Sequence, residues 1–370
     1  MAPAACLRGG DAGQWVDDGT FRRSDRMART PCYFHPEQLA FKPLYEWAFG
    51  EKIDHPETTA RAESILRALR GHGQAFEVIE PRQQPLAAIR DAHSNNLLTL
   101  YHTASRMPPG ETLYPSVFPR EFIRRGDPTN LRHAGCFCFD SGTPLNAMTM
   151  EAAAWSAACA HEGARRLKRG SDRLVYALSR PPGHHATREF FGGYSYFNNT
   201  VIAARYLRRH GRVAVLDIDF HHGNGTQTSF WRDDRVLTLS LHGDPKEYFP
   251  FYVGFPHETG QGRGEGYNLN FCFPGGTDFD AWMAVLLEEA LPAVERFGPD
   301  WLVVAAGFDT YHLDPIGAFT FRTGDYAVLG ERIGRLGLPT LVVQEGGYHS
   351  ADLGANAVSL LSGMREHLGP

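Results

Sequence analysis

The sequence predicts an α/β protein with a single open parallel β-sheet and helices on both faces. Three observations predict this class: short apolar segments recur along the chain, helical patterns separate them, and polar residues follow them directly. The segments are rich in β-branched residues and bounded by turn residues, which is typical of buried parallel strands. Such sheets bind ligands beyond the carboxyl ends of their strands. The segments lie at 173–180, 212–220, 235–242, 301–309 and 339–347.

The N-terminal part of the chain predicts further elements of the same kind. Residues 1–30 are rich in Gly, Arg and Asp without periodicity, so we expect a poorly ordered extension there and one catalytic domain over residues 31–370. A helical pattern covers residues 58–70, and FEVIEP follows as a short strand. Residues 85–106 predict one further helix.

A long irregular segment separates these elements from the five strands. Residues 107–145 are dense in Pro and Gly and have no clear period. A loop of this length inside a compact domain is usually functional or disordered, and its aromatic residues favour a functional role. A helix is predicted over residues 148–170, directly before the first of the five strands.

The composition excludes several classes of protein. The 370 residues are 42% hydrophobic and 21% charged, as in ordinary globular proteins. A net charge of -5 gives no electrostatic footprint for nucleic acid, and no stretch resembles a membrane span or a signal peptide. The six cysteines are too scattered for a disulfide framework. We therefore expect a soluble cytoplasmic protein without nucleic-acid or membrane partners.

Polar residues at four of the predicted strand ends are the candidate site. Because side chains alternate along a strand, Asp219 and His221 point to the same side and can bind one ion together. A carboxylate from Asp309 completes a set of two oxygen ligands and one nitrogen ligand, with positions left open as catalytic zinc requires. The strand-end residues are His184, His185, Asp217, Asp219, His221, Asn224, Asp309 and Tyr348.

Each of these patterns has a plainer explanation when taken alone. A capped turn after a strand explains Asp-x-Asp-x-His, a satisfied histidine pair explains His184 and His185, and a buried tyrosine with a bonded hydroxyl explains Tyr348. The convergence of four strand ends on one crevice argues against these explanations. Cys136 and Cys138 are too close together for a typical paired zinc motif, so the metal is expected at the strand ends.

The strand-end residues supply each part of an amide hydrolysis. The reaction needs a nucleophilic water, a base, an acid for the leaving amine and a donor for the developing oxyanion. Zinc would polarise the carbonyl and lower the pKa of water from about 16 to about 7. One histidine of the pair would take the proton while the other holds positive charge or water, and Tyr348 would donate to the oxyanion. No Gly-x-Ser-x-Gly elbow or phosphate-binding loop competes.

Six motifs together resemble the histone deacetylase superfamily, and most closely its bacterial acetylpolyamine amidohydrolases. The resemblance spans about residues 31–370 and implies an arginase-like α/β fold with one catalytic zinc per subunit on Asp219, His221 and Asp309. It implies that Tyr348 binds the oxyanion and that His185 is the general base and acid. The motifs are RPPGHHA, GGYSYFNN, LDIDFHHGNGTQ, SLHGDP, GFDTYHLDP and QEGGY.

The same resemblance implies partners for the two histidines. His184 would be the electrostatic partner of His185, with Asp217 supporting His184 and Asn224 supporting His185. Asn224 stands where the class I enzymes carry aspartate, and the class II and bacterial members share the asparagine. Because Asn224 is uncharged, the pKa of His185 should be lower than in a His-Asp pair.

Structural potassium and a narrow substrate tunnel are also implied by the resemblance. Bulky aromatic tunnel walls would select a linear chain. The tunnel residues would be Gly193, Tyr194, Phe249 and Ile316. One potassium site would use Asp217, Asp219, His221, Ser240 and Leu241, and another Phe230, Asp233, Val236 and Tyr267.

The segment 107–145 is the most informative feature for the substrate. In the acetylpolyamine enzymes a similar insertion narrows the entrance, takes part in dimerisation and presents acidic residues to the distal ammonium of the substrate. Glu111 and Glu121 are the candidates here, and each also fits an ordinary solvated charge. The resemblance implies acetylputrescine or acetylcadaverine as the type of substrate, and a homodimer or higher homo-oligomer.

Several alternatives stay open. Deacetylation of acetyllysine in peptides or proteins uses the same chemistry and differs only in how open the tunnel mouth is. A silent acyl-ligand binder on the same fold would have lost a metal ligand, a histidine of the pair or Tyr348, and none is missing. A binuclear site of the arginase type needs more carboxylates. Iron(II) or cobalt(II) suits the ligand set as well as zinc does.

Overall fold

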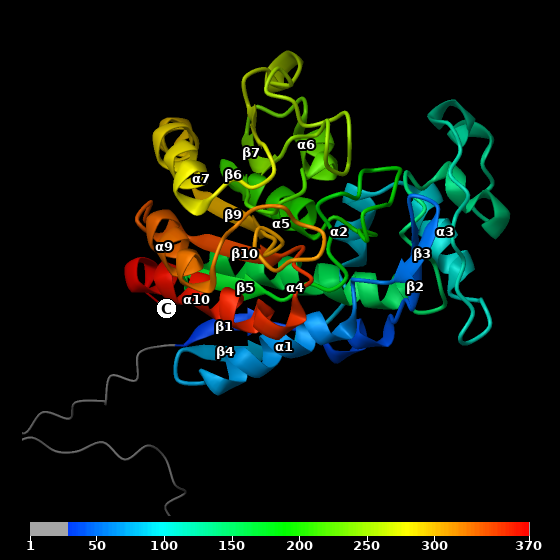
Figure 1. The fold of residues 1–370 in the computed structure, drawn as a ribbon, viewed down its shortest axis with the longest axis horizontal. Helices are drawn as coiled ribbons and strands as arrows, with labels where there is room; N and C mark the ends of the chain where they lie inside the picture. Colours follow the sequence, from blue (N-terminus) through cyan, green and yellow to red (C-terminus); the bar gives the residue numbers. More distant parts are fainter. Residues whose placement is uncertain (1–28, 370) are drawn as a thin grey trace, which may run out of the picture.

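The computed structural model describes residues 29–369 and contains the predicted parallel sheet. Eight strands form one sheet in the order β4-β1-β5-β10-β9-β6-β7-β8, and all neighbouring strands run parallel (Figure 1). All five predicted strands are present, as β5, β6, β7, β9 and β10. The bounds are β1 Thr30–Tyr33, β4 Phe76–Ile79, β5 Leu174–Ala177, β6 Val213–Asp217, β7 Val236–Gly243, β8 Asn268–Phe273, β9 Trp301–Ala306 and β10 Thr340–Gln344.

Helices cover both faces of the sheet (Figure 1). On one face α1, α9 and α10 pack together, and on the other α4 packs against α5, with α2 and α3 outside them. No helix within residues 29–369 is long and apolar enough to cross a membrane. The bounds are α1 Thr59–Gly71, α2 Leu86–Ala92, α3 Asn95–Ala104, α4 Thr149–Arg169, α5 Asn199–Arg208, α6 Asn224–Phe230, α7 Phe279–Val285, α8 Leu291–Phe297, α9 Thr323–Gly334 and α10 Ser350–Leu368.

Alternate residues of the strands fill two separate cores. In β6, Ala214 and Leu216 belong to the core under α1, α9 and α10, whereas Val213 and Val215 belong to the core under α4 and α5. This alternation is expected for a strand that is buried on both faces. Because both faces are apolar, polar side chains that follow the strands collect at the carboxyl edge of the sheet.

The prediction of one helix over residues 85–106 is wrong, because the structure has two helices there. His93 has an extended backbone (φ -120°, ψ 156°), and the Ser94 hydroxyl caps the start of α3. The buried His93 ring contacts the Thr187 carbonyl at 2.9 Å and accepts from the Asn198 amide at 2.9 Å. The break in the helix thus places a histidine that braces the loop after β5.

Four short strands were not predicted from the sequence. They are β1, β8 and the two strands of an antiparallel hairpin, β2 (Tyr45–Ala48) and β3 (Glu51–Asp54). The segments β1, β2 and β3 have four residues each, which is too short for an alternating pattern to stand out. Residues 1–28 of the predicted N-terminal extension lie outside the described residues, and Thr30, its last residue, belongs to β1 instead.

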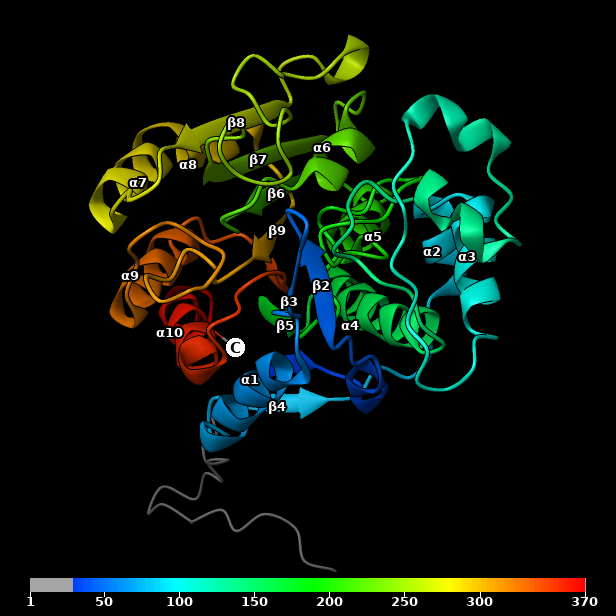
Figure 2. The same cartoon turned by 45° about the vertical axis from the view of Figure 1, so that its right-hand side comes forward.

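The segment 107–145 forms a lobe beside the β2–β3 hairpin. It contains two 3-10 helices, η2 (Arg120–Arg125) and η3 (Leu131–Cys136), and a bridge between Leu113 and Leu145 closes it. Figure 1 shows the blue hairpin between this teal lobe and the main body, and in Figure 2 the same hairpin lies in front of the main body. The Tyr114 hydroxyl donates to the Tyr45 carbonyl at 2.6 Å, which ties the lobe to the hairpin. The lobe and hairpin are therefore built as one unit.

The contact between α9 and α10 depends on glycine at position 330. A Cβ atom added there would lie 2.1 Å from the Leu360 carbonyl oxygen, so Gly330→Ala must push the two helices apart. We expect this variant to lower the free energy of unfolding by roughly 1–3 kcal/mol in urea titrations. Gly324→Ala, at an open position of the same helix, is the matched control and should be neutral or slightly stabilising. Equal stability of the two variants would contradict this packing.

Candidate active site

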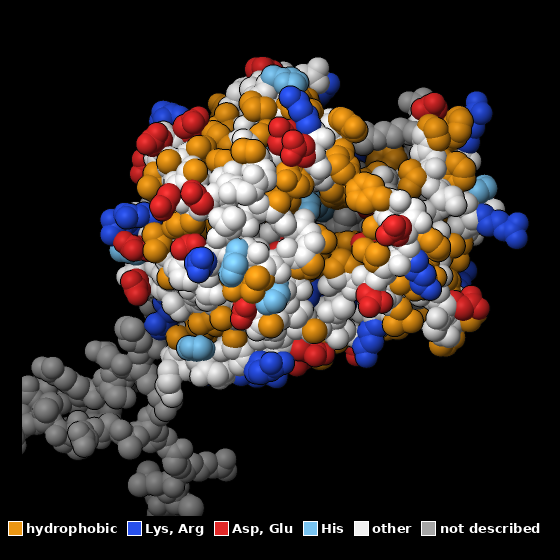
Figure 3. Space-filling model, viewed as in Figure 1, with side chains coloured by type: hydrophobic (Ala, Val, Ile, Leu, Met, Phe, Trp, Pro, Cys, Tyr) orange, Lys and Arg blue, Asp and Glu red, His pale blue; other side chains and the backbone are white. Residues whose placement is uncertain are grey.

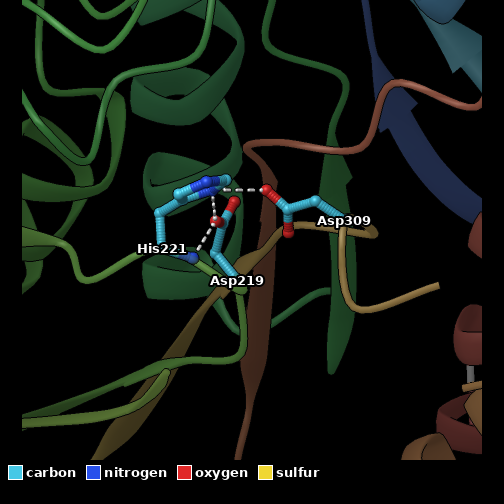
Figure 4. Close-up of side chains that lie close together, drawn as sticks. All are labelled: Asp219, His221 and Asp309. Atoms are coloured by element: carbon cyan, nitrogen blue, oxygen red, sulfur yellow. Dashed lines mark hydrogen bonds and ion pairs between the residues drawn. The ribbon is translucent and has the colours of Figure 1, made fainter. Parts of the chain in front are cut away.

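Three ligand-type side chains converge where β6 and β9 end. One ligand atom from each of Asp219, His221 and Asp309 lies within 4.8 Å of the others, and no other such cluster occurs in the part of the chain that the structure describes. His221 Nδ1 is 2.9 Å from Asp309 Oδ2 and 3.4 Å from Asp219 Oδ1 (Figure 4). The structure thus brings together the three residues predicted to hold a metal.

The electrostatics of this cluster favour a positive charge at its centre. Asp219 and Asp309 are fully buried, and burial raises the pKa of Asp309 to about 7, with the Asp219 charge adding to the effect. Although burial disfavours an imidazolium, the two carboxylates raise the pKa of His221 to about 10. Two carboxylates and one imidazole are ligands that suit a divalent cation such as zinc.

Two glycines, Gly307 and Gly346, leave room for the carboxylates of Asp219 and Asp309. A Cβ atom at Gly307 would lie 1.9 Å from Asp219 Oδ2, and one at Gly346 would lie 2.3 Å from Asp309 Oδ2. The Gly346 amide instead donates to Asp219 Oδ2 at 2.8 Å, and the Phe220 amide donates to Asp309 Oδ1 at 2.8 Å. The backbone therefore orients both carboxylates before any ion binds.

The tandem histidines lie beside this cluster, with their rings 4.0 Å apart. His184 Nδ1 contacts Asp217 Oδ2 at 2.9 Å, and His185 Nδ1 donates to Asn224 Oδ1 at 2.8 Å. The His185 ring centre is 6.2 Å from that of His221. These contacts match the pairing that the resemblance implied for both histidines.

The two histidines have opposite charge preferences. Burial disfavours charge on both, but the carboxylates of Asp219 and Asp217 raise the pKa of His184 to about 10. For His185, burial and the positive charge of His184 hold the pKa well below 6.5. His184 is therefore an imidazolium at neutral pH, whereas His185 is a neutral ring with its proton on Nδ1 and a free lone pair on Nε2.

A buried glutamate at the end of β10 holds the backbone of the histidine pair. Glu345 Oε2 accepts from the Gly183 amide at 2.6 Å and from the His184 amide at 3.0 Å, and Oε1 accepts from the Thr200 hydroxyl at 2.7 Å. Burial raises the pKa of Glu345 to about 7, while the nearby His184 charge lowers it. Glu345 lies in the QEGGY motif, but the sequence indicated no role for it.

Two further groups fix the loop that carries Tyr348. Asp314 Oδ2 accepts from the Tyr348 amide at 2.6 Å, and Asp314 Oδ1 accepts from the Ile316 amide at 3.1 Å. Arg61, on α1, donates to the carbonyls of Gly347 and Glu345 at 2.5 Å each, and its guanidinium carbon lies 4.7 Å from the centre of the Tyr348 ring. Burial keeps the pKa of Tyr348 well above 10, so its phenol stays protonated.

The predicted tunnel residues lie near His185 or near the loop that carries Tyr348. The Phe249 ring centre is 5.0 Å from that of His185, and the Tyr194 ring centre is 5.8 Å from that of Tyr348. A Cβ atom at Gly193 would lie 2.3 Å from His185 Cδ2, so only glycine leaves the base accessible at this position. Ile316 is half-buried on the turn that Asp314 holds. All four residues therefore lie at or beside the site.

The predicted potassium residues form two groups at opposite ends of β7. Asp217 and Ser240 are register partners on β6 and β7, and Leu241 follows Ser240. At the other end, Val236 is the first residue of β7, and the Asp233 amide donates to the Phe230 carbonyl at 2.9 Å. The Tyr267 carbonyl accepts from β7 as well, at the amide of Thr238. The two potassium sites stay predictions.

The acidic candidates of the segment 107–145 are exposed, and a different carboxylate lies beside Tyr194, one of the predicted tunnel residues. Glu111 and Glu121 both lie at the surface. Glu46, on β2, is only 5% exposed, and its Oε2 is 2.7 Å from where a Cβ atom of Gly142 would lie. Burial raises the pKa of Glu46 to about 7, partly offset by a hydrogen bond from Tyr194. The sequence did not single out Glu46, because β2 gives no pattern that predicts a buried acid.

Comparison with known proteins agrees with this geometry. The histone deacetylase domain matches residues 55–364. Acetylpolyamine amidohydrolase 2 of Pseudomonas aeruginosa is 40% identical over 315 residues, which cover 83% of this chain and 91% of that protein. The acetylpolyamine amidohydrolase of Burkholderia pseudomallei is 40% identical over 343 residues, which cover 90% of this chain and 98% of that protein.

The fold comparison gives the same result. A crystal structure of acetylpolyamine aminohydrolase from Burkholderia pseudomallei matches with a TM-score of 0.84 and 38% sequence identity, covering 91% of this chain and 98% of that chain. The predicted deacetylase-like α/β fold and the predicted resemblance are therefore confirmed.

The charge difference between the histidines predicts a specific pH effect. Asn224→Asp places a carboxylate on His185 Nδ1 and should raise the pKa of His185 by about one unit or more. A base is lost as pH falls through its pKa, so the acidic limb of the kcat/KM profile for amide hydrolysis should move to higher pH. The pH dependence of the melting temperature of the same variant controls for a change in folding. An unmoved acidic limb would show that His185 is not the base.

Arg61 is predicted to act by holding Tyr348. Arg61→Lys keeps the charge but loses the planar donor fork, so kcat should fall by on the order of tenfold with little change in KM. In a Tyr348→Phe background Arg61→Lys should lower kcat little further, because the hydroxyl that Arg61 positions is already absent. Arg67→Lys, at an exposed position of the same helix, is the control. Independent, multiplying effects of the two substitutions would refute the positioning role.

Proposed function

The chain belongs to the histone deacetylase family, and we propose that it deacetylates N-acetylated polyamines of the acetylputrescine or acetylcadaverine type with one zinc ion per subunit. Three observations support the proposal. The metal ligands, the tandem histidines and Tyr348 lie together at one edge of the sheet. Relatives named as acetylpolyamine amidohydrolases match most of the chain. The buried carboxylate of Glu46 lies beside Tyr194, one of the predicted tunnel residues.

The candidate metal ligands are compatible with zinc. Asp219, His221 and Asp309 offer two oxygen ligands and one nitrogen ligand, which leaves coordination positions for substrate and water. When bound, zinc supplies a Lewis acid that polarises the amide carbonyl and makes a neighbouring water a better nucleophile. Iron(II) or cobalt(II) would supply the same chemistry on this ligand set.

The proton transfers follow from the charges of the two histidines. His185 is neutral and has its proton on Nδ1, held by Asn224, so Nε2 is the atom that takes a proton from the attacking water. The protonated Nε2 then returns this proton to the leaving amine. His184 keeps its positive charge beside Asp217, whose carboxylate lies 2.9 Å from Nδ1 and raises the pKa of this histidine. Its fixed positive charge stabilises the negative charge that develops on the substrate.

Tyr348 and Gly193 complete the site around the reacting amide. The Tyr348 phenol stays protonated, so its hydroxyl can donate a hydrogen bond to the oxyanion. The lack of a side chain at Gly193 lets a slender chain pass the His185 ring, and the Phe249 ring forms the wall beside it. The site is thus suited to an acyl group on an unbranched amine.

Glu46 is the observation that carries the choice of a cationic amine. Its carboxylate lies beside Tyr194, whose ring contacts that of Tyr348, so it is close to the path that leads to the reacting amide. The hairpin that carries Glu46 and the lobe 107–145 also border this side of the molecule. A buried carboxylate is stabilised by a positive partner, and the free ammonium of an acetylated diamine would supply one. The potassium ions, the homodimer and the cytoplasmic location stay predictions.

The proposed substrate class is tested by kcat/KM on acetylputrescine, acetylcadaverine and an acetyllysine peptide, with metal-stripped protein as the control. Acetylated diamines should be preferred, and Glu46→Gln should raise their KM by on the order of tenfold. Because Glu46 gains its charge as pH rises through about 7, KM for the diamines should fall over that range and become flat in the variant. N-pentylacetamide, which has no ammonium, should be insensitive to the substitution.

Matched variants separate the alternatives. Glu51→Gln, at an exposed position of the same hairpin, should leave KM unchanged. If Glu111→Gln or Glu121→Gln raises KM and Glu46→Gln does not, the ammonium site lies on the lobe instead. A higher kcat/KM for the peptide would make the protein a lysine deacetylase. No activity on any of the three substrates would contradict the proposal.

A further inference from the structure

Three charged side chains are buried next to the loops that carry the catalytic groups. Lys, Arg, Asp and Glu side chains are spread over the face of the molecule in Figure 3, where water surrounds them. Glu57, Arg61 and Arg180 are instead each at most 2% exposed. Charged side chains are almost never buried to this degree unless they are paired, because removing a charge from water is very unfavourable. The contacts of these three residues therefore indicate a specific role.

A single carboxylate joins the two arginines. Glu57 lies just before α1, and its Oε1 is 2.8 Å from Arg61 Nη1 and 2.8 Å from Arg180 Nε. Its Oε2 accepts from Arg180 Nη2 at 3.0 Å. The Glu57 amide donates to Nδ1 of the buried His55 at 3.1 Å, which fixes the backbone that carries the carboxylate. Both guanidinium groups thus share one negative charge.

Arg61 holds the tyrosine loop, which comprises residues 345–348. Its Nη2 donates to the Glu345 carbonyl and its Nε to the Gly347 carbonyl, at 2.5 Å each. Its Nη1 is the atom that contacts Glu57. Each nitrogen of the Arg61 guanidinium therefore has a separate acceptor, so the contact with Glu57 sets the direction in which this group faces the tyrosine loop.

Arg180 begins the histidine loop, which comprises residues 180–185. Its backbone amide donates to Gln38 Oε1 at 2.5 Å, and its Nη1 donates to the Gln38 carbonyl at 2.7 Å. Its Nη2 also donates to the Phe41 carbonyl at 2.9 Å. Together with the contacts to Glu57, these bonds fix the start of the loop that leads to His184 and His185.

The two loops are also joined directly, by Glu345. This residue belongs to the tyrosine loop, and its Oε2 accepts from the amides of Gly183 and His184 in the histidine loop. One connection alone would let the two loops pivot about it, whereas a second connection fixes their relative position. Glu57 and its two arginines supply this second connection.

We propose that Glu57 is a positioning residue, which fixes Tyr348 relative to His185 by holding Arg61 and Arg180 with one carboxylate. The inference rests on the proposed function, because the oxyanion donor and the base must then act on the same amide. A displacement of about 1 Å of a catalytic group can lower a rate by on the order of a hundredfold. Glu57 touches neither the substrate nor the reacting atoms in this proposal, and it acts through the two arginines.

The first test compares two acyl groups in Glu57→Gln, which removes the charge with little change in size. The kcat for acetylputrescine should fall by on the order of tenfold with little change in KM. For N-trifluoroacetylputrescine, whose fluorines stabilise the oxyanion, kcat should fall by only about threefold or less. Loss of folded protein would lower both kcat values equally. That result, or two unchanged kcat values, would overturn the proposal.

A second variant covers the case that Glu57→Gln does not fold. Glu57→Asp keeps the charge, but its shorter side chain cannot reach both guanidinium groups at once, so it should show the same selective loss of kcat for acetylputrescine. Glu63→Gln, at an exposed position of α1, is the matched control and should leave both kcat values unchanged.

Hydrogen–deuterium exchange tests the connection without any turnover. In Glu57→Gln or Glu57→Asp, the amides of residues 183–185 and 346–348 should both exchange on the order of tenfold faster, while those of β7 keep their rate. Faster exchange in only one loop, or equally in β7, would refute the proposal. If no acetylated diamine is hydrolysed, the proposed function fails, and the exchange rates still decide whether Glu57 connects the two loops.

Discussion

The rest of the structure depends on one constraint, the burial of negative charge at the carboxyl edge of the sheet. Asp217, Asp219, Asp309 and Glu345 are each at most 2% exposed. A buried carboxylate without partners is very unfavourable, so each must accept hydrogen bonds or lie beside positive charge. Backbone amides donate hydrogen bonds to Asp219 and Asp309, and His184 contacts Asp217. The geometry of the cluster suits a cation, which would balance the negative charge that these contacts leave. The glycines after β9 and β10 follow from the same constraint, because a side chain there would collide with the carboxylates.

The same constraint makes two adjacent residues of one type act differently. His184 faces Asp217 and Asp219 and is charged, and this charge in turn lowers the pKa of His185. A carboxylate in place of Asn224 would oppose that effect, so the uncharged amide belongs to the mechanism by which a neutral base is kept next to a positive charge. Burial alone would make both rings neutral, and it is the arrangement of carboxylates that separates them.

The sequence predicted the chemistry well because that chemistry lies at strand ends. Apolar runs predicted five strands, and the alternation of side chains predicted that Asp219 and His221 point to the same side. The role of Arg61 was not predicted, although the sequence gives an indication of it. Arg61 is a charged residue on the otherwise apolar face of α1, together with Ile65. Glu46 left none, because a buried acid on a strand of four residues is recognised only when the neighbouring elements are in place. The break at His93 was missed for the same reason, since its partners lie about 100 residues away in the chain.

Specificity therefore belongs to parts of the chain that differ physically from those that carry the reaction. The sheet edge is fixed by packing on both faces, so its catalytic geometry allows little variation. The residues of the β2–β3 hairpin belong to neither of the two cores. Because neighbouring residues of a strand face opposite sides, the Glu46 carboxylate is buried beside Tyr194 while the Trp47 side chain is 42% exposed. The proposed recognition of a cationic amine thus depends on a side chain of the hairpin, whereas the proposed reaction depends on the edge of the sheet.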